Sequence, residues 1–152
     1  MFDEIKKWLQ SHEIQFKEIH HEPTFTSEQS ANARGEDLST GGKALIMKVG
    51  KEFKIFVISA SKKIDSSAIK KYFGVKKLRF VNPEELKELT GLVPGSVPPL
   101  GQPFFDLELF IDESITQNEK IAFNAASLEN SLIIKVKDYL KITGGKIIKF
   151  SK

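Results

Sequence analysis

The sequence predicts a single α/β domain over residues 1–152, with a mixed, largely antiparallel sheet that is curled or partly closed into a barrel and flanked by helices. Two observations lead to this prediction. Short apolar runs outnumber helical repeats, and the spacers between the runs include both hairpin-length turns and helix-length segments. The chain has 152 residues, 40% of them hydrophobic, which is enough to bury one core.

Capping residues, apolar spacing and glycine stops predict the helices. Thr26 opens a capping box that begins one helix, and Gly35 ends it. Asp65 caps the next helix, and Asn82 followed by Pro83 begins another. The predicted helices are 2–13, 27–34, 66–73, 83–91 and 138–141.

Apolar runs bounded by turn residues predict the strands. Two of these runs flank the turn Gly50-Lys51-Glu52, an arrangement typical of a β-hairpin. The others are separated by predicted helices or by loops rich in glycine and proline. The predicted strands are 14–20, 44–49, 53–59, 78–81, 107–111, 121–123, 132–136 and 147–150.

Composition sets limits on the chemistry and the location. The chain has no cysteine, which excludes disulfides and thiolate chemistry. The first residues lack the apolar core of a signal peptide, and no run of about 18 apolar residues exists, so we expect a cytoplasmic protein with no membrane partner. The net charge of +3 permits RNA binding without requiring it, and no DNA partner is expected.

Lysine pairs in the middle of the chain form a predicted basic belt. The pairs are Lys62-Lys63, Lys70-Lys71 and Lys76-Lys77, and Arg79 follows them. Such a belt could follow a phosphate backbone, or it could be an ordinary solvated face.

A glycine hinge, Gly41-Gly42-Lys43, precedes an apolar strand. It is not a phosphate-binding P-loop, because Asp37 stands where that motif needs glycine and Ala44 stands where it needs serine or threonine. The apolar neighbours of Lys43 would desolvate its amine in part, so that the amine would favour an anionic or carbonyl partner. The alternative is a lysine that extends from a strand end into solvent.

A second loop runs from Gly95 to Gly101 and contains two adjacent prolines. Prolines hold one backbone shape and glycines admit close approach, so the loop is predicted to present fixed backbone groups to an oxyanion or a ribose hydroxyl. The alternative is a rigid surface turn.

No conventional catalytic motif accompanies these loops. His20 and His21 are adjacent on a predicted strand and point to opposite faces, and His12 lies on another element, so no metal site is predicted. There is no nucleophile elbow and no evident acid–base pair of carboxylates. We therefore expect no metal or organic cofactor, and a reaction on an already activated substrate such as an ester.

In order and spacing, several motifs together resemble the YbaK/ProX family of aminoacyl-tRNA deacylases, which are free-standing relatives of the editing insertion in bacterial prolyl-tRNA synthetases. The combination of Gly-Lys-Ala-Leu, Glu-Leu-Thr-Gly, Pro-Pro, Ile-Ala-Phe-Asn-Ala and Asp-Tyr-Leu is most similar to the YeaK-type branch, which is associated with removal of serine or threonine. One departure is Ala126, where relatives commonly have glycine; if that glycine needs a positive φ or passes close to substrate, alanine would affect the pocket. The motifs are His21-Glu22-Pro23, Ser27-Glu28, Arg34-Gly35, Gly42-Lys43-Ala44-Leu45, Glu84-Glu85-Leu86, Glu88-Leu89-Thr90-Gly91, Gly95-Ser96-Val97-Pro98-Pro99, Ile121-Ala122-Phe123-Asn124-Ala125 and Asp138-Tyr139-Leu140.

The resemblance implies a trans-editing hydrolase whose partner is aminoacyl-tRNA, held by its 3′-terminal adenosine and acceptor end. It implies that Lys43 binds the terminal phosphate or ester oxygen, that the second loop contacts the ribose and the ester, and that Asn124 binds the amino acid or holds the loop. The predicted catalytic residues are Lys43, Gly95, Ser96 and Pro99, and the predicted substrate-binding residues are Thr26, Gly42, Ser59, Ala60, Gly101, Asn124 and Ala125.

Three matters stay open at this point. The substrate could instead be proline tRNA charged with alanine or cysteine. The protein could be a non-catalytic module that binds a tRNA end, and an aminoacyl-tRNA synthetase could be a further partner.

Overall fold

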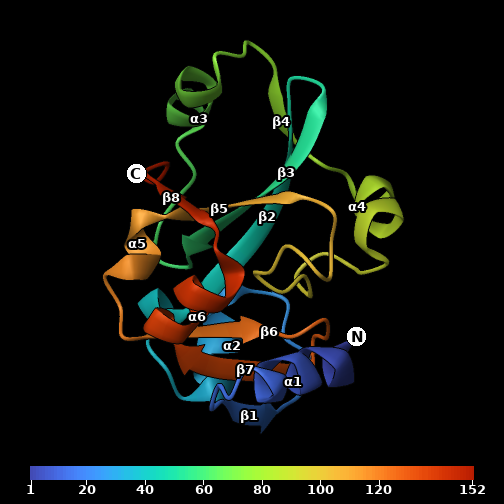
Figure 1. Ribbon diagram of the computed structural model, residues 1–152, viewed down its shortest axis with the longest axis vertical. Coiled ribbons are helices and arrows are strands. Elements are labelled where there is room, and N and C mark those ends of the chain that lie inside the picture. Colours follow the sequence, from blue (N-terminus) through green and yellow to red (C-terminus); the bar gives the residue numbers. More distant parts are fainter.

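The computed structural model describes residues 1–152 as one α/β domain with two sheets (Figure 1). The smaller sheet is antiparallel and has the order β1 (Lys17–His20), β7 (Asn130–Lys135), β6 (Lys120–Asn124). The larger sheet is mixed and has the order β4 (Leu78–Phe80), β2 (Gly42–Val49), β3 (Glu52–Ser59), β5 (Glu108–Asp112), β8 (Lys146–Ile148). In it, β5 pairs in parallel with both β3 and β8, and the other pairs are antiparallel.

The predicted fold class is confirmed, with a difference in how the strands are grouped. They form two sheets with free edges, and no closed barrel. A single parallel bridge, between Gly41 and Ala122, joins the start of β2 to β6 and connects the two sheets. The candidate functional site described below lies at this junction.

The helices follow the local signals closely. The Thr26 side chain accepts a hydrogen bond from the Gln29 amide, and Gly35 takes a left-handed conformation at the other end of the helix. A complete capping box joins Asn82 and Glu85. The main helices are α1 (Phe2–Ser11), α2 (Ser27–Arg34), α3 (Ser66–Phe73), α4 (Pro83–Thr90) and α6 (Val136–Thr143), none of them long and apolar enough to cross a membrane.

Two short elements were not predicted, because each is too short to show a periodic pattern. They are the 3₁₀ turn η1 (Leu38–Thr40) and α5 (Glu113–Thr116). Strand β1 is also shorter than predicted, since Ile14 and Phe16 leave the ladder and pack against the main core.

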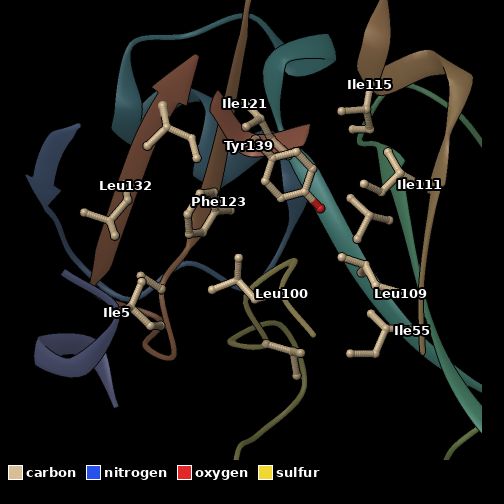
Figure 2. Close-up of a cluster of buried hydrophobic side chains, with 14 of the residues drawn as sticks. Ile5, Ile55, Leu100, Leu109, Ile111, Ile115, Ile121, Phe123, Leu132 and Tyr139 are labelled. Atoms are coloured by element: carbon tan, nitrogen blue, oxygen red, sulfur yellow. The ribbon is translucent and has the colours of Figure 1, made fainter. Parts of the chain in front are cut away.

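The main core lies between the two sheets and includes side chains from α1, α6 and the loop before β5 (Figure 2). Tyr139 of α6 is fully buried in it, beside Phe123 and Ile111, and its hydroxyl donates to the Pro99 carbonyl at 2.6 Å. Burial raises the pKa of the Tyr139 hydroxyl well above its ordinary value, so it remains a donor. The loop 95–101 is thereby fixed from behind.

A second core cluster fills the other face of the larger sheet. Phe56 stacks on Phe110 with ring centroids 5.6 Å apart and meets Phe150 edge-on at 5.2 Å. Ile69 packs α3 against this cluster, which fixes that helix near the turn of the β2–β3 hairpin.

Replacing Ala126 by glycine should stabilise the protein. Ala126 has a φ of 62°, a left-handed conformation in which a Cβ costs about 1–2 kcal/mol, and glycine removes that cost while adding less than about 1 kcal/mol of chain entropy. We expect the free energy of unfolding in urea to rise by about 0.5–1 kcal/mol. Ala125→Gly, at a buried neighbour without a positive φ, should lower it; equal destabilisation by both changes would contradict the prediction.

Candidate functional site

A pocket of about 220 Å³ opens where the two sheets meet. Its walls come from the beginning of β2, the end of β6, the segment that begins α2, and the loop before β5 (Figure 1). None of the lining residues is aspartate or glutamate. They are Thr24, Phe25, Thr26, Ser27, Ser30, Arg34, Gly41, Gly42, Lys43, Ala44, Leu45, Ala60, Gly95, Val97 and Asn124.

Lys43 enters the pocket from the second residue of β2. A Cβ on the preceding residue, Gly42, would lie 2.5 Å from the Ile121 side chain, so only glycine lets β2 begin this close to β6. Lys43 is half-buried and forms no ion pair with a carboxylate. Its ammonium is therefore available to a ligand.

Arg34 contributes a second positive charge, from the last turn of α2. It is nine-tenths buried, and no carboxylate pairs with it. Its Nε donates to Ser131 Oγ at 2.9 Å and its Nη2 to Asn124 Oδ1 at 3.0 Å, while Nη1 lies beside Gly41 at the pocket wall with no protein partner. Burial lowers the pKa of the Arg34 guanidinium to about 10, so it remains charged at neutral pH.

Asn124 joins this guanidinium to the second loop. Its Oδ1 accepts from Arg34 and from the Ser131 hydroxyl, and its Nδ2 donates to the Gly95 carbonyl at 2.9 Å. Of the two roles expected for Asn124, the loop-holding one matches these contacts. His21 extends the network: its Nδ1 donates to the Glu22 carbonyl, and its Nε2 lies 2.8 Å from Ser131 Oγ.

The loop 95–101 differs from the exposed backbone cradle that its composition predicts. Gly95 and Val97 reach the pocket, but the prolines are buried, and their carbonyls accept hydrogen bonds from the Leu100 amide and the Tyr139 hydroxyl. Ser96 is buried, and its Oγ donates to the Val93 carbonyl. Ser96 and Pro99 thus support the pocket wall from behind and do not line it, because the apolar side chains of the loop draw it into the core.

The structure brings together about half of the sequence-predicted site residues. Ser59 lies outside the pocket, where its Oγ donates to the Ser39 carbonyl and ties β3 to η1. Gly101 packs against the Leu107 carbonyl, and Ala125 is fully buried. The predicted residues that do line the pocket are Thr26, Gly42, Lys43, Ala60, Gly95 and Asn124.

Arg34 and Phe25 are among the pocket residues that were missed. Phe25 is 75% exposed although it lines the pocket, and its amide donates to Gln29 Oε1, which fixes it at the start of α2. A signal was present in the sequence: an aromatic residue before an N-cap normally packs on an apolar residue four positions into the helix, and here that residue is Ser30. An aromatic ring without its staple partner is free to contact a ligand.

The fold places the chain in a class of small α/β domains with known structures. It superposes on a crystal structure reported as a candidate trans-editing enzyme for prolyl tRNA synthetase, with a TM-score of 0.85 and 23% identity over 99% of this chain and 96% of that one. Residues 21–142 match the family model of the aminoacyl-tRNA editing domain. The chain belongs to this family, and the resemblance found in its motifs is confirmed.

Curated relatives agree with this assignment. The chain is 32% identical over 143 residues to the multifunctional Ser/Thr-tRNA deacylase ProXp-y of Escherichia coli K12, covering 90% of this chain and 84% of that protein. It is 24% identical over 109 residues to the proline–tRNA ligase of Macrococcus caseolyticus, covering 72% of this chain but only 19% of the ligase. The chain is thus an aminoacyl-tRNA editing domain, in a family that includes deacylases.

Proposed function

We propose that the protein is a trans-editing hydrolase that cleaves the ester of mischarged aminoacyl-tRNA. One observation carries the proposal: the pocket holds two cationic side chains, Lys43 and Arg34, and no carboxylate. Such a site favours a substrate with a phosphate and a developing oxyanion over a cationic or neutral one. The 3′ end of aminoacyl-tRNA has both.

The chemistry needs no protein nucleophile. Water adds to the ester carbonyl carbon, the C–O bond to the ribose breaks, and the ribose oxygen takes the proton. The Lys43 ammonium and the free Nη1 of Arg34 would bind the terminal phosphate and the carbonyl oxygen as charge develops on it. The neighbouring ribose hydroxyl would orient the water, as the family resemblance implies, and Gly95 would fix the ribose.

The size of the pocket favours a small amino acid. About 220 Å³ leaves little room beyond the ester and a short side chain, so that larger correct amino acids are excluded. Serine or threonine is our first choice, in line with the name of the E. coli relative, a Ser/Thr-tRNA deacylase. Alanine or cysteine on proline tRNA is the second choice. The expected place of action is the cytoplasm, alone or beside an aminoacyl-tRNA synthetase.

The test is hydrolysis of tRNAs charged with serine, threonine, alanine, cysteine or proline, with the protein at trace concentration. Multiple-turnover release of one small amino acid is the expected result. If the protein instead binds charged tRNA tightly and protects every ester, it is a non-catalytic module that holds tRNA ends, and the hydrolase proposal is wrong.

Replacing Phe25 by alanine should weaken binding of the 3′ end. An exposed ring at the pocket mouth can stack on the terminal adenine, and such stacking contributes about 1–3 kcal/mol. We expect KM for a short ester, an aminoacylated CCA trinucleotide, to rise roughly tenfold. Phe25→Tyr should retain binding, and Phe80→Ala, which removes another exposed ring outside the pocket, should have no effect. An unchanged KM for Phe25→Ala would contradict the stacking role.

A further inference from the structure

A second basic concavity lies at the other end of the β2–β3 hairpin from the pocket. We call it the basic groove. Four lysines and one arginine line it, with Gly50 and Leu78 as the remaining wall, and none of its lining residues is acidic. The five charged residues are Lys48, Lys70, Lys76, Lys77 and Arg79.

The backbone around the groove is held in place. The Gly50 amide in the hairpin turn donates to the Lys77 carbonyl at 2.9 Å, and the Val75 amide donates to the Lys70 carbonyl at the end of α3. Strand β4 then pairs with β2. The lysines therefore project from three elements that are fixed to one another, as a preformed surface requires.

The positive charge of the groove is only partly compensated. Arg79 pairs with Glu85 at 2.7 Å, but none of the four lysines forms an ion pair. Lys48 and Arg79 also face each other directly across the β2–β4 ladder, an arrangement of like charges that opposes sheet formation. The groove is thus a surface of partly uncompensated positive charge, and the fold keeps its like-charge pair at some cost in stability.

The position of the groove relative to the pocket suggests its ligand. Strand β2 begins at the pocket with Gly42 and reaches the groove at Lys48, which corresponds to about 20 Å along an extended strand (Figure 1). With one phosphate for roughly every 3.4 Å of axis on a stacked strand, this is roughly six nucleotides from the terminal adenosine. That distance reaches past the unpaired 3′ segment into the first base pairs of the acceptor stem.

We propose that the basic groove binds the phosphate backbone of the tRNA acceptor stem while the 3′ end occupies the pocket. This inference rests on the proposed function for its choice of RNA. The contacts would be to phosphate and not to bases, because lysine is a flexible point charge and reads no base pattern here. The groove would then supply affinity without selecting one tRNA species.

The experiment measures binding of an uncharged RNA hairpin with an acceptor-type stem and an unpaired CCA tail, at several salt concentrations. The test variant is the double substitution Lys76→Ala with Lys77→Ala, both exposed. The matched control is Lys137→Ala with Lys141→Ala, which removes the same charge from exposed positions on α6. Hydrolysis of the short ester on a CCA trinucleotide is measured in parallel for all three proteins.

We expect the groove variant to raise Kd for the hairpin roughly tenfold. The negative slope of the log binding constant against log salt should become shallower by roughly 1.5–2, and hydrolysis of the short ester should be unchanged. The control should change neither. Unchanged Kd and slope in the groove variant would overturn the proposal, and so would an equal loss on the short ester, since the lysines would then act through the pocket. Binding that depends on the groove, without hydrolysis of any ester by the wild-type protein, would support the groove and refute the hydrolase.

Discussion

Replacing Lys43 by alanine should lower the rate of ester hydrolysis by about 100- to 1,000-fold, the usual effect of removing one preorganised group that stabilises an oxyanion. The reason is positional. Lys43 is the one ammonium in the pocket, at the end of a strand whose start is fixed by the close packing of Gly42 on Ile121. The pocket has no carboxylate or histidine that could activate water and so compensate for the loss of Lys43.

The fold should tolerate this change, because Lys43 is half-buried and has no carboxylate partner to leave unpaired. Circular dichroism and urea unfolding check that it does. Lys51→Ala, in the exposed hairpin turn, is the matched control and should keep full activity. Near-normal hydrolysis by a folded Lys43→Ala protein would remove Lys43 from the mechanism.

Local chemistry explains which parts of the fold could be predicted. The bounds of α2 and α3 come from a cap and a glycine stop a few residues apart, so the sequence contains the whole signal. The division into two sheets depends on which strands pair across long separations, such as the bridge between Gly41 and Ala122. No local pattern contains that information.

The same distinction applies to the candidate site. Lys43 was found because its glycine hinge is local, and the loop 95–101 was found because its prolines are adjacent. Whether that loop is exposed depends on Tyr139, forty residues away, whose hydroxyl holds the Pro99 carbonyl inside the core. Arg34 resembles any solvated helix-terminal arginine until β6 and β7 are placed beside it.

The fold buries the charged Arg34 guanidinium in spite of a large desolvation penalty, which suggests that Arg34 serves the ligand. A pKa lowered to about 10 by burial corresponds to roughly 3 kcal/mol of unfavourable free energy for the charged form. Because the pKa is lower in the folded state than in the unfolded state, this penalty is fully present below about pH 10 and is relieved only as the pH rises above it. Its hydrogen bonds to Ser131 and Asn124, at about 1.5–3 kcal/mol each, are together at least as large as this penalty, so the buried charge and its partners add little net stability.

Arg34→Met should therefore lower ester hydrolysis by about 100-fold while changing the free energy of unfolding by less than about 1 kcal/mol, or raising it. The substitution leaves no buried acceptor unsatisfied. Asn124 Oδ1 keeps the Ser131 hydroxyl, Asn124 Nδ2 keeps the Gly95 carbonyl, and methionine fills much of the space of the arginine stem. Hydrolysis of charged tRNA and urea unfolding at neutral pH measure the two effects.

The conservative variant distinguishes a ligand-binding arginine from a structural one. Arg34→Lys keeps the charge, but its ammonium cannot donate to Ser131, to Asn124 and into the pocket from one planar group. This variant should therefore be less stable than Arg34→Met and less active than the wild-type protein. If Arg34 instead serves to hold the sheets together, Arg34→Met should destabilise the protein by about 3–5 kcal/mol, as loss of a needed buried partner does. A stable methionine variant with little activity would mean that the buried charge is retained for the anionic end of the substrate.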